Sequence, residues 1–377
     1  MRNFVMTSDA VTMGHPDKLC DQISDAVVDA WLTEGNRGGV NAECAIASGV
    51  AFLAVRSGAP VSADLAALVR RVVAAAGYNG GDKDRMSVIL DVAQDAALTP
   101  EQVAKGLPRH MVTAIGYACE GPGAMPAPVM LARRMARLMW AARVDGRRGW
   151  LLPDAKAQVA VRFEDRHAME VTAVTLALAT ETKIPEASLE SLLREEVIGP
   201  TLEAQGLEAA PDLWLSVQDG LGPVGPAVHT GLTGRKTGQD GYGSFVRHSG
   251  SALSGKDPSR IDRVADYAAR HAARGVIAAG LARECEVQLT WVPGDASPVS
   301  IEVDTWQSGR MPDVDIKRLL QDRVDFRLAA IAERFGLWSL PGDRGGRFYQ
   351  DLASCGQIGR DDMELPWDAP SLANDLA

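Results

Sequence analysis

The sequence predicts an α+β fold, in which helices cover one face of each sheet and the other face is open. Two kinds of period support this. Apolar residues recur at every fourth position from Asp17 to Leu32, as on one face of a helix, whereas residues 285–303 alternate between apolar and polar. Three stretches share a strand–helix–strand–strand pattern without repeated sequence, so we expect three domains, at roughly 1–97, 105–222 and 224–365.

The amino-terminal elements follow from these periods. The first helix has an apolar stripe made by Leu19, Ile23, Val27 and Trp31. Residues 40–55 are apolar and strand-like, and a second helix begins near Ser62 with Leu65, Leu68 and Val72 on one side.

The later elements include a long alanine-rich helix between Pro258 and Leu281, which we expect to bury Ile261, Ala265, Ala268, Ala272 and Val276. Two alternating runs on either side of residues 293–298 predict a hairpin with one solvent-exposed face. The expected linkers are rich in Pro and Gly and lie near Leu107, at 219–223 and at 341–346.

Composition narrows the class of protein. The net charge of the 377 residues is −10 and the pI is about 5.2, which argues against non-specific binding to nucleic acid or to anionic membranes. Five scattered cysteines without a CxxC pair are typical of reduced thiols in the cytoplasm. We expect neither a signal peptide nor a membrane span, because no apolar run approaches the length that either needs.

Three polar segments interrupt these apolar surroundings. In Gly14-His15-Pro16-Asp17-Lys18, a helix start can hold phosphate and Asp17 can hold a metal ion, although plain N-capping is the alternative. Asp154 and Lys156 precede a strand-like run and are otherwise a surface ion pair. The third segment holds basic and acidic residues in two glycine-containing loops, which are otherwise solvated: Arg235, Lys236, Lys256, Asp257 and Asp262. Together they suggest a metal–polyphosphate site that is not a Walker A loop.

Longer runs carry a resemblance to a known family. The sequences TSDAVTMGHPDKLCDQISDAVVDAWL, MPAPVMLARRM and LLPDAKAQVAVRF, and the long run that begins GLTGRKTGQDGYGSF at residue 231, resemble S-adenosylmethionine synthetases, also called methionine adenosyltransferases. The resemblance extends over nearly the whole chain.

The resemblance implies a fold and a reaction. Members of this family have three intertwined α+β domains with pseudo-threefold symmetry, and they form dimers or dimers of dimers with active sites between subunits. In the family reaction, methionine sulfur attacks C5′ of ATP and the triphosphate leaves, then is hydrolysed. Fixed cations and Mg²⁺ stabilise a leaving group of about four negative charges.

The resemblance also implies roles for individual residues. The positions that match phosphate or nucleotide contacts are His15, Asp154, Lys156, Arg235, Lys236, Ala252 and Lys256. Asp17 and Asp262 match magnesium ligands, and Glu43 matches the carboxylate that binds a monovalent cation, K⁺. These residues predict that ATP is a substrate.

The methionine-binding positions depart from the family. His229, Arg260 and Arg56 replace Asp, Lys and Glu, respectively, and Leu98 stands near the position of a Gln. His110 occurs where the family has Asp in a mobile loop, and Leu221 replaces an aromatic residue that stacks on adenine. The family's set has a net charge of −1, whereas Arg56 and Arg260 give +2 here, which disfavours an ammonium group.

The sequence therefore predicts a Mg²⁺-dependent adenosyltransferase that releases triphosphate and whose acceptor is an anionic small molecule. His229 or His110 could serve as a general base. The alternatives are an ordinary methionine adenosyltransferase with an altered pocket, a non-catalytic nucleotide-binding relative, and an ATP triphosphohydrolase.

Overall fold

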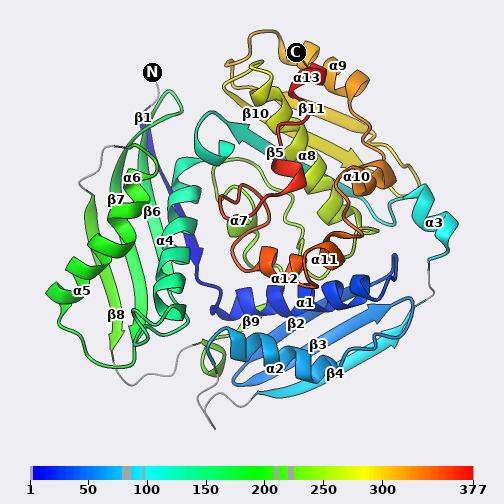
Figure 1. Ribbon diagram of the computed structural model, residues 1–377. Helices are drawn as coiled ribbons and strands as arrows, with labels where there is room; N and C mark the ends of the chain where they lie inside the picture. The colour runs from blue at the N-terminus through cyan, green and yellow to red at the C-terminus, as the bar shows by residue number, and fades with distance from the viewer. Residues whose placement is uncertain (1–2, 79–85, 96–97, 208–210, 220–224, 377) are drawn as a thin grey trace.

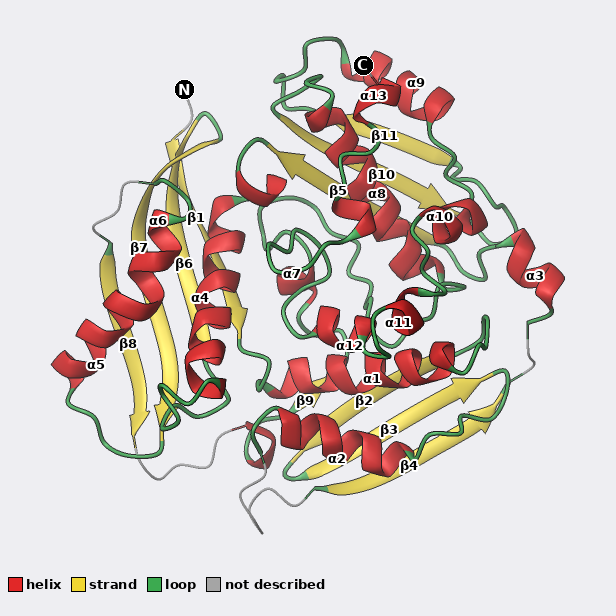
Figure 2. Cartoon of the chain, in the orientation of Figure 1, coloured by secondary structure: helices red, strands yellow, loops and turns green. Residues whose placement is uncertain are grey.

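Three sheets surround a helical centre in the computed structural model, which describes residues 3–78, 86–95, 98–207, 211–219 and 225–376. Each sheet turns one face towards helices that lie nearer the middle, and the three sheets form the periphery (Figure 1). The same view by secondary structure shows helices and loops filling the space between the sheets (Figure 2). The predicted α+β class is confirmed. Within the described ranges, no helix has the length and apolar character needed to cross a membrane.

The amino-terminal sheet has the strand order β4-β3-β2-β9. Helices α1 and α2 cover its inner face (Figure 1), whereas side chains on its outer face, such as Phe52 and Ile89, are exposed. The elements are α1 (Pro16–Thr33), β2 (Asn41–Ala47), β3 (Val50–Ser57), α2 (Leu65–Ala75), β4 (Ser87–Gln94) and β9 (Gly231–Leu232).

The second sheet has the order β1-β6-β7-β8, with α4 packed against β1 and β6. Its elements are β1 (Asn3–Val11), α4 (Ala127–Val144), β6 (Lys156–Glu164), β7 (His167–Thr180), α5 (Glu186–Leu193), η3 (Arg194–Ile198), α6 (Gly199–Glu203) and β8 (Asp212–Asp219).

The third sheet has the order β11-β10-β5, and α8 packs on β5 and β10. Its elements are β5 (Val112–Cys119), α8 (Ile261–Ala278), β10 (Glu284–Trp291), β11 (Ser300–Asp304), α9 (Asp313–Arg323) and α10 (Leu328–Arg334). The shorter helices are α3 (Pro100–Lys105), η2 (Pro122–Ala124), η4 (Gly225–Ala227), α7 (Thr237–Asp240), α11 (Leu340–Asp343), α12 (Phe348–Ala353), η5 (Pro366–Asp368) and α13 (Ala373–Leu376).

The chain is interleaved between the sheets. Strand β1 pairs with β6 over its whole length, β5 pairs with β10, and β9 joins the edge of β2. Each sheet therefore combines strands from distant parts of the sequence, which brings residues near 15, 155, 235 and 256 towards one another.

Several predicted elements are confirmed. Helix α1 includes the predicted Asp17–Leu32, and α8 buries all five residues of its predicted inner face. The predicted run 40–55 is two antiparallel strands, β2 and β3. The hairpin β10–β11 is present, but its polar face is not fully solvent-exposed, because Glu286 is 2% exposed and pairs with Arg247. The expected linker at 341–346 includes most of the short helix α11.

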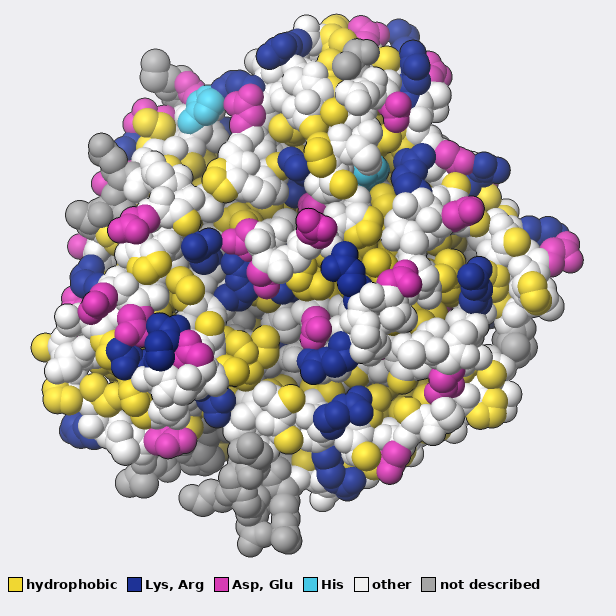
Figure 3. Space-filling model, in the orientation of Figure 1, with side chains coloured by type: hydrophobic (Ala, Val, Ile, Leu, Met, Phe, Trp, Pro, Cys, Tyr) yellow, Lys and Arg dark blue, Asp and Glu magenta, His cyan; other side chains and the backbone are white. Residues whose placement is uncertain are grey.

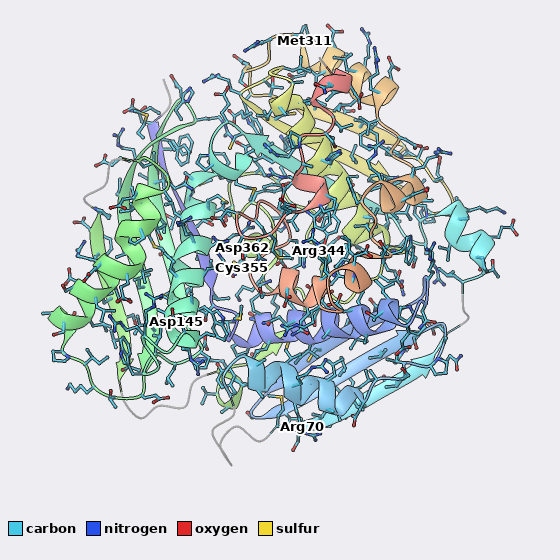
Figure 4. The ribbon with its side chains drawn as sticks, viewed as in Figure 1. Arg70, Asp145, Met311, Arg344, Cys355 and Asp362 are labelled. Atoms are coloured by element: carbon cyan, nitrogen blue, oxygen red, sulfur yellow. The ribbon has the colours of Figure 1, made fainter. Side chains whose placement is uncertain are left out.

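The carboxy-terminal segment closes the centre. Trp367 stacks on Tyr267 of α8 with 3.6 Å between ring centroids. Asp362, labelled near the middle of Figure 4, pairs with Arg137 of α4 at 3.0 Å. Acidic and basic side chains are interspersed on the face seen in Figure 3, which agrees with the absence of a strongly basic composition.

Candidate active site

The amino-terminal end of α1 is shaped by His15 and Pro16. His15 is the N-cap, where its Nδ1 accepts the backbone N–H of Asp17 at 3.2 Å, and Pro16 supplies a φ suited to the first helical position. Burial, together with the charge of Lys236, lowers the pKa of His15 to about 4, so the ring is neutral near pH 7. A neutral ring that accepts at Nδ1 carries its proton on Nε2 and can donate there.

Asp17 lies where the start of α1 contacts the first basic loop, which is the segment 231–236 that holds Arg235 and Lys236. Its Oδ1 accepts the backbone N–H of Leu232 at 3.0 Å, and Arg235 Nη1 lies 3.7 Å from the same oxygen. The ammonium group of Lys236 contacts Oδ2. Asp17 is only 1% exposed, so its carboxylate is fixed between two cations.

Asp154 and Lys156 approach this helix end from the start of β6. Burial raises the pKa of Asp154 to about 6, and nearby His229 opposes this rise. His229 also helps to lower the pKa of His15, so the two histidines and Asp154 are neighbours. Lys156 is half exposed and pairs with Asp9 of β1 at 2.7 Å.

The second basic loop is the segment 254–258, which holds Lys256 and lies just before the start of α8. Lys256 Nζ is 3.2 Å from Asp262 Oδ2, and His110 Nε2 is 2.9 Å from the same oxygen. Burial raises the pKa of Asp262, but Lys256 and His110 outweigh it and hold the pKa below its usual range. Asp257 is different, because its two oxygens accept the backbone N–H groups of Val40 and Ser259, at 2.5 and 2.6 Å.

Arg260 and Leu98 lie beside this loop. Arg260 is the N-cap residue of α8, and its buried Nε has no hydrogen-bond partner within the described part of the chain. A cavity of about 1070 Å³ is lined by residues that include Leu98, Arg109, Ser259 and Trp338. The residue next to Arg260 therefore faces a cavity that Leu98 also lines.

Both basic loops run along the same edge of β2. Leu232 pairs with Ala45, and Lys256 pairs with Asn41, four residues earlier on the strand. At about 3.3 Å per residue, the two pairing positions are about 13 Å apart. Ala252 lies next to the first loop, since a Cβ added to Gly234 would come within 2.3 Å of the Ala252 Cβ.

The outer face of the same sheet carries Glu43 and Arg56. Glu43 is exposed, and its Oε1 accepts from Asn41 Nδ2 at 3.4 Å. Arg56 Nη2 lies 2.6 Å from the Asp91 carboxylate, and Nη1 donates to the Asp91 carbonyl oxygen at 3.1 Å. The charge of Arg56 is therefore paired with a residue of β4. The predicted change at Leu221 lies outside the described residues.

The carboxylates of this region suit a metal ion that also binds phosphate. Among the residues that the structure describes, no three His, Cys, Asp or Glu side chains converge as a complete metal cage. Mg²⁺ in nucleotide sites commonly takes one or two carboxylates together with phosphate oxygens. Asp17 and Asp262, each surrounded by cations, fit that requirement.

Sequence reasoning missed three acidic residues of this region. The role of Asp91 was not predicted because its partner Arg56 lies 35 residues away in the sequence, on the neighbouring strand of a parallel pair. Asp21 and Asp25 accept hydrogen bonds from the two basic loops. They follow Asp17 by four and eight residues, a spacing that is visible in the sequence and could have revealed them.

Comparison with known proteins gives consistent matches. Residues 3–99, 109–217 and 224–369 match the N-terminal, central and C-terminal domains of S-adenosylmethionine synthetase. An S-adenosylmethionine synthase of Synechococcus elongatus is 36% identical over all of this chain and 97% of its own length. Those of Prochlorococcus marinus and Trichormus variabilis are each 38% identical, over 98% and 100% of this chain and 94% and 96% of their own lengths.

Proposed function

Because this chain belongs to the S-adenosylmethionine synthetase family, whose enzymes are methionine adenosyltransferases, we propose that it transfers the adenosyl group of ATP to methionine. The sulfur forms a bond to C5′ while the C5′–oxygen bond breaks and its electron pair leaves with triphosphate. Water then hydrolyses triphosphate to pyrophosphate and phosphate. The observation that carries this proposal is the buried carboxylate of Asp17 between Arg235 and Lys236 at a helix end.

The basic residues have a direct role in this reaction. Negative charge moves onto the triphosphate as the C5′–oxygen bond breaks, and fixed cations stabilise that charge without rearranging. We assign this role to Lys156, Arg235, Lys236 and Lys256, with Asp154 and Ala252 as further nucleotide contacts. His15 adds a neutral Nε2–H donor.

The proposed cofactors are Mg²⁺ and K⁺. Mg²⁺ neutralises phosphate charge when bound. Asp17 and Asp262 are the residues that would hold it, and Glu43 is the carboxylate proposed for K⁺.

We propose that the active form is a homodimer or a dimer of dimers. The outer face of the amino-terminal sheet exposes Val50, Phe52 and Ile89, at 37%, 42% and 53%. Glu43 and Arg56 share this face, because the strand register aligns Glu43 with Ala54 and places Arg56 two residues farther along β3. A contiguous exposed apolar area beside polar site residues suits a second copy of the chain.

The observations that bear on the acceptor point in different directions. The relatives are named for S-adenosylmethionine synthesis, and the ion pair with Asp91 cancels the charge that made Arg56 unfavourable to an ammonium group. Both favour methionine. Arg260, whose buried Nε has no hydrogen-bond partner among the described residues, favours an anionic acceptor, as do His229 and His110, and we keep this as the second candidate.

The test is incubation of the purified chain with ATP, Mg²⁺ and either methionine or a panel of phosphonates and dicarboxylates, followed by mass spectrometry. The proposal expects S-adenosylmethionine and triphosphate-derived products, and their loss in EDTA. An adenosyl adduct of an anion alone would favour the second candidate. Adenosine with triphosphate would indicate an ATP triphosphohydrolase, and no turnover would indicate a non-catalytic relative.

A further inference from the structure

Helix α1 carries an aspartate at every fourth position from Asp17 to Asp29. Four-residue spacing places side chains on one face of a helix, one above another. All four aspartates are at most 1% exposed. Each accepts at least one backbone N–H from outside α1: Leu232 at Asp17 and Gly234 at Asp21, both in the first basic loop, Gly255 at Asp25, and Tyr349 and Gln350 at Asp29.

Asp21 holds the first basic loop from both ends. Its Oδ1 accepts the Gly234 N–H at 2.8 Å, and Gly234 directly precedes Arg235 and Lys236. Its Oδ2 lies 2.9 Å from Lys18 Nζ, which also binds Asp240 at 2.6 Å, on the other side of the same basic pair. The two cations therefore lie between two attachments to α1.

Asp25 holds the second basic loop in the same way. Its Oδ1 accepts the Gly255 N–H at 2.7 Å, and Gly255 directly precedes Lys256. The same oxygen binds the guanidinium of Arg263, which follows Asp262 on α8 and donates its Nε to the Leu253 carbonyl at 3.0 Å. Lys256 is thus fixed between Gly255 and the start of α8.

The two glycines adopt the same left-handed backbone. Gly234 has φ of +81° and Gly255 has φ of +80°, a region that side chains disfavour. A Cβ on Gly255 would lie 1.9 Å from the Ala42 carbonyl oxygen, so this loop also packs directly on β2. The two separate loops therefore share one construction, in which a glycine bound to α1 directly precedes the cations.

We propose that Asp21 and Asp25 are positioning residues, each of which fixes one basic loop for binding a triphosphate group. The proposal rests on the function proposed above. Each carboxylate also pairs with a buried cation, Asp21 with Lys18 and Asp25 with Arg263, and such charge-assisted hydrogen bonds shielded from water are among the stronger ones. Successive aspartates on α1 are rigidly related, so they hold Arg235, Lys236 and Lys256 in place before the ligand arrives.

Asp29 provides a matched internal control. It lies on the same face of α1, is equally buried, and also accepts backbone N–H groups, at 2.9 and 2.8 Å. Those groups belong to α12, which carries none of the proposed phosphate contacts. Loss of the Asp29 carboxylate should therefore affect stability without affecting the basic loops.

The experiment measures binding of magnesium tripolyphosphate to the full chain by isothermal titration calorimetry, with thermal unfolding of each variant. We expect Asp21→Asn and Asp25→Asn to raise Kd about ten-fold or more, and to lower kcat while KM for methionine stays constant. Asp29→Asn should lower the unfolding temperature but keep Kd within about two-fold of the wild-type value. A double variant, Asp25→Asn with Arg263→Gln, avoids leaving the guanidinium unpaired, and it should also bind weakly.

Three results would overturn parts of this scheme separately. Folded Asp21→Asn and Asp25→Asn proteins, or a folded double variant, with wild-type Kd would refute the positioning role. An Asp29→Asn protein that binds as weakly as the other two would show that the effect is only a loss of fold stability. If the wild-type chain itself fails to bind magnesium tripolyphosphate, the proposed function fails and the positioning role fails with it.

Discussion

The proposed ATP side and the proposed acceptor side of the candidate site are constructed differently. On the ATP side, Asp17, Arg235 and Lys236 meet at a helix end, and their loop is attached to buried groups of α1. On the acceptor side, Arg56 is the next-to-last residue of β3 on an open sheet face, and Arg260 caps a different helix, α8. Residues anchored in a buried core keep one arrangement without a ligand. Residues on an open face instead pair with whatever a neighbouring strand presents, as Arg56 does with Asp91.

The largest expected effect is at Asp17. Asp17→Asn should reduce kcat for triphosphate formation about 100-fold or more, because it removes the charge that fixes both cations and the proposed Mg²⁺ ligand. Asp64→Asn is the matched control, since Asp64 also accepts an N–H at the start of a helix, α2, but no basic loop contacts it in the described residues. Full activity in EDTA, or equal effects of the two substitutions, would contradict the special role of the α1 end.

The sequence predicted more of the proposed ATP side than of the proposed acceptor side, and the reason is physical. Periodicity located α1 and α8, and short motifs located the charged residues at their ends, because these features depend on near neighbours in the chain. The pairing of β1 with β6, and of Arg56 with Asp91, depends on strand order and register, which no local period encodes. The count of two positive charges in the acceptor pocket therefore omitted Asp91.

A smaller effect is expected at His15. In His15→Asn, the amide oxygen can still accept the Asp17 N–H, so the helix start should persist while the Nε2–H donor is lost. We expect kcat to fall about ten-fold, with little change in the unfolding temperature. His15→Ala should lose the cap as well, at about 1 kcal/mol of stability. Steady-state kinetics and thermal unfolding would separate the roles, and an unchanged kcat in His15→Asn would exclude the donor role.

The acceptor side can be tested through the Arg56–Asp91 pair. Asp91→Asn leaves the Arg56 charge unpaired and should raise KM for methionine several-fold, whereas Arg56→Ala leaves a free carboxylate and should lower it. KM for ATP should stay constant in both. Arg162→Ala is the control, because Arg162 likewise pairs with acidic residues on a sheet, Glu164 and Glu170. If the two variants shift KM for methionine in the same direction, the pair does not act through its charge.

The smallest expected effect is on the pH dependence of stability, and it distinguishes a histidine of the core from a histidine of the site. His271 lies in α8 at 2% exposure, with Phe335 packed edge-to-face at 5.1 Å and Ser371 Oγ at 3.2 Å. Burial, aided by the charges of Arg334 and Arg274 against that of Asp368, lowers its pKa to about 4.

Between pH 6.5 and 4, unfolded His271 therefore binds a proton that the folded chain does not. Its contribution to stability is complete above pH 6.5 and falls as the pH drops through this window, by at most about 1.4 kcal/mol per pH unit. In His271→Asn that part of the slope should disappear from the pH dependence of the free energy of unfolding, measured by urea denaturation, while kcat at pH 8 stays unchanged. His15→Asn should flatten the same window and also lower kcat. If His271→Asn lowers kcat as much as His15→Asn does, the assignment of His271 to the core and of His15 to the site is contradicted.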